Sequence, residues 1–177
     1  MDFVRSIGNT MVQKLDSFQG TEMERKVKEA TSNEGWNSSN TTKNEIADAT
    51  FNSQSFREVM GILWKRLGEK ESNWRIVFKS LELLMYLLKY GSDKVVEDTR
   101  DHQSALKALQ AFSCVDPSHG DDKFVRERKK RGPKKKEGGR GIRQLSQQII
   151  DLVEDAKRLK DVRNEAQKQR VYKTIIK

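Results

Sequence analysis

The stretch from Trp74 to Tyr90 constrains the fold of this chain more than any other feature of the sequence. It is apolar on almost every side, and a glycine, Gly91, follows it directly. A helix that is apolar all round is stable only when other elements cover it, and this one is shorter than the roughly 20 apolar residues that cross a bilayer. We therefore predict a central core helix that ends at Gly91 in a left-handed stop.

Other helix boundaries follow from capping signals. Gly68 follows the periodic apolar stretch from Phe56 to Leu67, which predicts a second helix end. Three pairs with the spacing of a capping box predict three helix starts: Thr21 with Glu24, Thr42 with Glu45, and Ser55 with Glu58.

Two amphipathic patterns occupy the second half of the chain. Ala105, Leu106, Leu109 and Phe112 predict a short helix. A longer helix is predicted by apolar residues that repeat at three and four positions: Ile142, Leu145, Ile149, Val153, Ala156 and Leu159. The stretch 129–141 between them, rich in Gly, Pro and Lys, reads as a loop, and no alternating strand pattern is present. The fold class is therefore all-α.

Catalytic and metal-binding chemistry find no support in the sequence. Cys114 is the one cysteine, so it cannot form an internal disulfide, and with His102 and His119 it does not give a zinc-site spacing. No phosphate-binding glycine loop or nucleophile elbow is present. We expect a non-enzymatic protein of the reducing cytoplasm, with no cofactor and no metal.

The net charge of +9 comes from one segment. Residues 123–143 hold eleven Lys or Arg against two Glu, whereas the rest of the chain balances, with 24 basic and 24 acidic residues. Such a run suits an anionic leaflet, where each cation contributes about 1 kcal/mol. It also suits nuclear import, a nucleic-acid contact, or a solvated loop. The six residues that form its core are Lys129, Lys130, Arg131, Lys134, Lys135 and Lys136.

Residues 2–16 form an amphipathic pattern. Placed at 100° per residue, their apolar side chains share one broad arc and their polar side chains share the other. The pattern fits a helix that folds on a membrane surface, and equally a first helix that packs on the bundle. The candidate membrane-inserting residues are Phe3, Val4, Ile7, Met11 and Leu15.

Six short motifs, in order, resemble the epsin N-terminal homology (ENTH) domain of endocytic adaptors. They span about residues 1–172. They are Lys26–Asn33 followed by Trp36, Glu45–Asp48, Trp64–Leu67, Asn73–Arg75, Tyr86–Ser92, and Val115 with Asp116.

The resemblance implies a right-handed superhelix of about eight short helices. It divides the chain into a membrane-inserting segment 1–17 that becomes helical when phosphoinositide binds, an ENTH-like domain 18–172 with a basic insertion 128–141, and a tail 173–177. The implied function is that of a phosphoinositide-binding peripheral membrane protein that promotes curvature in clathrin-linked vesicle formation. The resemblance implies a cytoplasmic, peripheral location at the plasma membrane, the Golgi or endosomes, or on clathrin-coated vesicles. It also implies that clathrin and adaptor partners bind to regions outside this sequence.

Headgroup binding is carried over from the family residue by residue. The matching positions are Lys14, Lys28, Asn33, Arg66 and Lys79, and Arg5 is a candidate substitute donor near the start. We expect Lys28 and Arg66 to be exposed, although isolated lysines such as Lys28 and Lys79 are also often ordinary solvated residues.

Ser72 and Ile76 stand where epsin has two further donors, so the preference for a particular phosphoinositide is open, and Lys70 is a candidate replacement. The alternative function is a helical scaffold that binds protein or nucleic acid and is localised by its basic loop.

Overall fold

The computed structural model describes residues 20–35, 38–114 and 139–175, with side chains to Tyr172. This part of the chain contains eight α-helices, two 3-10 turns and no strand. The helices are α2 (Glu22–Ala30), α3 (Asn40–Ala49), α4 (Ser53–Leu67), α5 (Trp74–Tyr90), α6 (Asp93–Asp101), α7 (Gln103–Ala108), α9 (Arg140–Glu154) and α10 (Ala156–Ile175), and the turns are η1 (Glu71–Asn73) and η2 (Leu109–Ala111).

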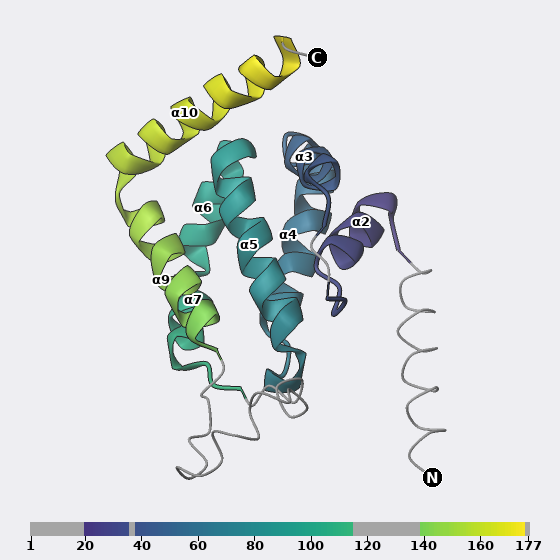
Figure 1. Ribbon diagram of the computed structural model, residues 1–177, viewed down its shortest axis with the longest axis vertical. Helices are drawn as coiled ribbons and strands as arrows, with labels where there is room; N and C mark the ends of the chain where they lie inside the picture. The colour runs from purple at the N-terminus through teal and green to yellow at the C-terminus, as the bar shows by residue number, and fades with distance from the viewer. Residues whose placement is uncertain (1–19, 36–37, 115–138, 176–177) are drawn as a thin grey trace, which may run out of the picture.

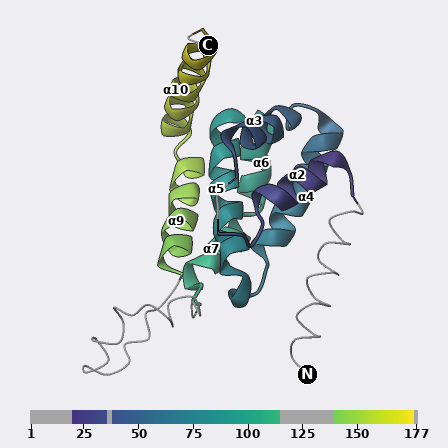
Figure 2. The same ribbon diagram turned by 45° about the vertical axis from the view of Figure 1, so that its right-hand side comes forward.

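Helix α5 is the centre of the molecule, as its apolar sequence predicts. It contacts α3, α4, α6, α9 and α10, and the ribbon shows α2, α3 and α4 on one side of it and α9 on the other (Figure 1, Figure 2). Val77, Leu81, Leu84 and Leu87 on this helix have no exposed surface. Burial of each leucine contributes about 1.5–3 kcal/mol, so α5 anchors the core of this all-α, solenoid-like fold.

The helix starts follow local capping, but two of the three predicted starts are wrong. Thr21 caps α2 and accepts a hydrogen bond from the Glu24 amide, as predicted. Helix α3, in contrast, begins after Ser39, whose hydroxyl accepts from the amide of Thr42. Helix α4 begins after Asn52, whose side chain accepts from two amides. In both cases an earlier polar residue accepts hydrogen bonds from the first amides of the helix, which have no partner within the helix. The helix therefore starts earlier than predicted.

Both glycines predicted as helix ends do end helices, but neither is left-handed. Gly68 and Gly91 have φ angles of −86° and −85°. Gly91 is instead required by close packing, because a Cβ atom there would lie 2.7 Å from the carbonyl oxygen of Leu87 and 3.0 Å from Oγ1 of Thr50. Real Cβ atoms do not approach backbone oxygens so closely.

The long C-terminal helix predicted over residues 142–159 is in fact two helices. The chain turns at Asp155, which has a ψ angle of 89°, and Asp155 Oδ1 accepts a hydrogen bond from the amide of Arg158. Asp155 therefore caps the start of α10, although the three- and four-residue spacing of apolar side chains continues through this position. Helix α9 begins at Arg140, inside the predicted loop 129–141, and α10 continues to Ile175, so the predicted tail 173–177 begins inside α10.

Helix α10 lies across the end of the bundle (Figure 1), and two of its arginines bind the neighbouring elements. Arg163 donates to the carbonyl oxygens of Leu88 and Gly91 at 2.8 and 2.7 Å, and its Nη2 lies 3.0 Å from Oδ1 of Asp93. Arg170 donates to both carboxylate oxygens of Asp48 on α3. The described helices include none that is long and apolar enough to cross a membrane.

Candidate functional site

Cationic side chains gather around the C-terminal end of α2 and the turn that follows it. Arg66, near the end of α4, donates through Nη2 to the carbonyl oxygens of Lys28 and Thr31, at 3.2 and 2.9 Å. Lys79 of α5 donates through Nζ to the carbonyl oxygen of Glu34 at 2.6 Å. The last carbonyls of a helix have no partner within the helix, and they attract cations. Two helices therefore position this turn from opposite sides.

The environment of Arg66 differs from the sequence expectation. We expected an exposed arginine, but its side chain is half-buried, and burial lowers the pKa of the guanidinium, an effect that Glu69 partly opposes. Its Nε atom is buried without a hydrogen-bond partner among the described residues. A guanidinium with an unsatisfied donor is costly to bury. Arg66 therefore holds the turn through its Nη2 contacts and leaves one buried donor, Nε, unsatisfied.

Lys79 is not an ordinary solvated lysine, which was the alternative that the sequence left open. Its exposed fraction is 7%, and burial lowers the pKa of its ammonium group. Glu34 and Glu82 oppose this shift, whereas the positive charges of Arg75 and Lys43 add to it. Two acidic and two basic neighbours therefore act on this buried ammonium group, and the two acids have the larger effect.

The structure thus brings together four of the six predicted headgroup residues. Lys28 is half-buried, Asn33 is exposed in the turn, and both lie in the segment that Arg66 and Lys79 hold. The remaining predicted residues lie outside the described part of the chain: Arg5 and Lys14, the membrane-inserting Phe3, Val4, Ile7, Met11 and Leu15, and the basic-loop residues Lys129, Lys130, Arg131, Lys134, Lys135 and Lys136.

Two positions near the site depart from the epsin pattern in the way the sequence suggests. Ile76 is 8% exposed and packs in the interior, so it offers no donor to a ligand. Ser72 is exposed in η1, and Lys70 is exposed directly before this turn. Of these residues, Ser72 and Lys70 are therefore accessible to a ligand, and Ile76 is not.

Arg75 and Lys43 are neighbours of the site that the sequence analysis missed. Arg75 precedes Lys79 by four residues on α5, a spacing that places two side chains on one helix face, so it could have been found. Lys43 comes from α3, and no local pattern connects it with α5. The proximity of a residue near the start of a separate helix is revealed only by the tertiary fold.

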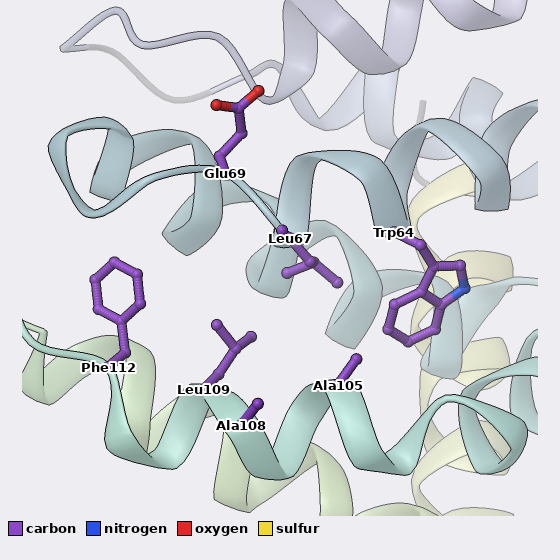
Figure 3. Close-up of a pocket in the computed structure, with 8 residues that line it drawn as sticks. Trp64, Leu67, Glu69, Ala105, Ala108, Leu109 and Phe112 are labelled. Atoms are coloured by element: carbon purple, nitrogen blue, oxygen red, sulfur yellow. The ribbon is translucent and has the colours of Figure 1, made fainter.

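A second concave feature lies apart from these cations, between the end of α4 and the α7–η2 segment (Figure 3). It has a volume of about 320 Å³ and is mainly apolar, with Trp64, Leu67, Leu109 and Phe112 in its wall. Glu69 is the charged residue of its lining, and its Oε2 accepts from Asn73. A negative rim does not attract a phosphate, so this hollow does not compete with the cationic cluster. The described residues also hold no group of three or more His, Cys, Asp or Glu that could bind a metal.

Comparison with known proteins decides the family. The profile of the ENTH domain matches residues 20–159, which is most of the chain. The chain belongs to the ENTH domain family. Among curated relatives, it is 36% identical to Epsin of Dictyostelium discoideum over 145 residues and 38% identical to human Epsin-2 over 148 residues. These matches cover 82% and 84% of this chain but only 19% and 21% of the relatives, so this ENTH domain spans about a fifth of their length.

Solved ENTH domains share its fold. The crystal structure of the human epsinR ENTH domain superposes with a TM-score of 0.72 at 36% identity, covering 85% of this chain and 99% of that one. The ENTH domain of epsin-2 in complex with phosphatidylinositol 4,5-bisphosphate superposes with a TM-score of 0.71 at 28% identity, covering 84% and 93%. A structure of helical ANTH and ENTH tubules on membranes containing this lipid gives a TM-score of 0.65 at 28% identity and 97% coverage of both chains.

Proposed function

We propose that this ENTH domain binds a phosphoinositide headgroup and acts as a peripheral membrane module of an epsin-like adaptor in clathrin-linked vesicle formation. The observation that carries the proposal is the convergence of Lys28, Asn33, Arg66 and Lys79 on one turn. A fold relative, the ENTH domain of epsin-2, has been solved with phosphatidylinositol 4,5-bisphosphate. Charge-assisted hydrogen bonds from such a cluster suit the phosphates of an inositol ring.

The N-terminal segment and the basic loop extend this proposal. Arg5 and Lys14 add donors to the headgroup site, and the apolar face of residues 2–16 inserts shallowly into one leaflet and favours curvature. Support comes from the amphipathic sequence pattern and from the relative solved as tubules on membranes. The basic residues between Lys129 and Lys136 strengthen attachment to any anionic leaflet.

The biological setting is proposed from the family. Adaptors of this kind work without catalysis, and we propose the same for this chain. Its sites of action are cytoplasmic membrane faces at the plasma membrane, the Golgi or endosomes and on clathrin-coated vesicles, where longer epsin-like proteins meet clathrin and other adaptors through regions beyond the ENTH domain.

The test must spare the contacts that hold the fold. Because Arg66 and Lys79 bind backbone carbonyls, reversing their charge would damage the turn itself. Asn33→Asp instead adds one negative charge at an exposed position of nearly unchanged shape. Asn164→Asp makes the same change on the exposed surface of α10 and serves as the matched control.

The measurement is sedimentation with vesicles that carry each phosphoinositide or phosphatidylserine of equal charge. Asn33→Asp should weaken phosphoinositide binding about tenfold, since a like charge opposes the phosphates at close range, while Asn164→Asp should not change it. Equal binding by both variants would refute the site. Versions lacking residues 1–17, or with the basic loop neutralised, then separate the other two contributions: the first should lose insertion, and the second should lose affinity for both lipids alike.

A further inference from the structure

A long groove runs between α5 and α9 and reaches α3. Its volume is about 540 Å³, and on α5 its lining extends from Phe78 to Tyr90. Twelve residues of helix rise about 18 Å, the length of roughly three helical turns. Gly141 and Leu145 lie on the opposite wall, on α9. The lining thus extends along α5 and α9, two helices that lie side by side (Figure 1).

The floor of the groove is apolar and already ordered. Its apolar side chains are half-buried against the core and remain partly open to solvent: Phe78, Met85, Tyr86, Tyr90 and Leu145. The Tyr86 and Tyr90 rings pack with their centroids 4.5 Å apart, and the Tyr86 hydroxyl donates to Oδ1 of Asn44 at 2.6 Å. Side chains that are fixed before a partner arrives lose little entropy on binding.

The rim of the groove carries a positive charge. Lys43 of α3 and Lys89 of α5 line it, and neither makes an ion pair with any described residue. Arg140 is exposed directly before Gly141. Glu82 is the acidic residue of the lining. The amides of Gln144 and Gln148 complete the wall on α9.

We propose that this groove binds an amphipathic helix of another protein, with an apolar stripe facing the floor and acidic side chains facing Lys43 and Lys89. Helix-in-groove recognition uses apolar residues at three- and four-residue spacing, which matches a floor about three turns long. The positive rim selects partners of opposite charge. Lys43 is also a neighbour of Lys79, so the groove borders the proposed headgroup site, whereas Gln144 and Gln148 of the groove lie on α9.

The probe is a phage-displayed library of helical peptides of about 14 residues, selected on the full chain in lipid-free buffer. Selected peptides should carry an apolar stripe flanked by Asp or Glu. Their affinities are then measured by fluorescence anisotropy for the wild type and for two groove variants, Lys43→Glu with Lys89→Glu, and Gln144→Glu with Gln148→Glu. The second pair changes exposed residues only, so it keeps the test valid if the first destabilises the fold.

Each groove variant should raise the Kd of the acidic peptides at least about tenfold. The control, Lys65→Glu with Lys107→Glu, makes the same charge change as the lysine pair, at exposed positions on α4 and α7, and should leave the Kd unchanged. The proposal is overturned if no peptide is enriched, if enriched peptides are basic or lack the stripe, or if groove and control variants bind alike. Sedimentation that shows a dimer lost in the groove variants would also overturn it, because a second copy would then be the occupant.

Discussion

Arg66 and Arg163 make the same contact in two regions of the molecule. Arg66 binds carbonyl oxygens at the end of α2, and Arg163 binds the carbonyl oxygens of Leu88 and Gly91 at the end of α5. Arg163 also has a carboxylate, Asp93, within 3.0 Å. Arg66 has no carboxylate of the described residues at ion-pair distance, and burial lowers the pKa of its guanidinium.

The difference shows what separates a structural cation from a candidate ligand residue. Arg100 and Arg143 also donate to carbonyl oxygens, so the contact alone does not mark a binding site. The surroundings do. Arg66 contacts the segment that contains Lys28 and Asn33 and that Lys79 also binds, so several cations gather there, whereas Arg163 has the carboxylate of Asp93 as a neighbour.

The largest effect is expected on stability at the α5 end. Arg163→Ala removes two charge-assisted hydrogen bonds to partly buried carbonyls and should lower the free energy of unfolding by about 2–4 kcal/mol. Urea denaturation followed by circular dichroism measures the change. Arg158→Ala, an exposed neighbour on α10, is the control and should stay within about 0.5 kcal/mol of wild type. If both variants unfold alike, Arg163 does not hold α10 in place.

Paired Arg→Lys changes sharpen the comparison further. A lysine keeps the charge but loses the fork that reaches two acceptors, so Arg66→Lys and Arg163→Lys should each cost about 1 kcal/mol in stability. Vesicle sedimentation should separate them, with phosphoinositide binding weakened about tenfold by Arg66→Lys and unaffected by Arg163→Lys. Equal binding losses would mean that stability, not ligand contact, explains both.

A smaller, pH-dependent effect distinguishes Lys79 from Lys26. Burial lowers the pKa of Lys79 in the folded chain. Between that lowered pKa and the unfolded value of about 10.4, the unfolded chain holds more protons, so this group makes stability rise with pH. Hydrogen bonds from Lys26 to Glu22 and Glu45 raise the Lys26 pKa instead. The contribution of Lys26 to stability is therefore fully present below its pKa in the unfolded chain, and it is lost as the pH rises through its higher pKa in the folded chain.

The check is the free energy of unfolding of wild type and Lys79→Met, measured from about pH 8 to the unfolded lysine pKa of about 10.4. The free energy of unfolding of the variant should rise less with pH than that of the wild type. Loss of the hydrogen bond to the Glu34 carbonyl lowers this free energy at every pH and does not change the slope. Parallel slopes would show that the ammonium group of Lys79 is not desolvated.

The smallest effect concerns the acid that accompanies Arg163. The Asp93 side chain is 92% exposed, so Asp93→Asn should change stability by less than about 0.5 kcal/mol. If Asp93→Asn lowers the free energy of unfolding as much as Arg163→Ala does in the same urea titration, the ion pair contributes more to stability than the carbonyl contacts do.

The sequence predicts the core helix and the helix ends well because these depend on local patterns. The all-round apolar character of Trp74–Tyr90 specifies a covered helix, and Gly68 and Gly91 mark real ends. Starts were less predictable, since closely spaced Ser, Thr and Asn residues offer several caps and only packing selects one. The break at Asp155 is hidden for the same reason, because the apolar period continues through it.

The sequence names candidate residues for the site but does not predict their environment. The ENTH resemblance names Lys28, Asn33, Arg66 and Lys79, and the fold gathers them. Their burial was not predictable, because the carbonyl acceptors lie 35 to 45 residues away in sequence and have no side-chain signature. Only the tertiary fold shows that the cations of this site are also its scaffold.

The crowding at Gly91 has a consequence for how the chain tolerates change. Thr50 from α3, Leu87 from α5 and Val95 from α6 all lie within 3.3 Å of where a Cβ would be, and Arg163 from α10 grips the carbonyl of the same residue. Even alanine would have to displace a backbone oxygen. Residues of α5, α6 and α10, together with the residue that ends α3, therefore meet at a position that has no room for a side chain. Any side chain at position 91 would therefore force neighbouring backbone and side-chain atoms to shift.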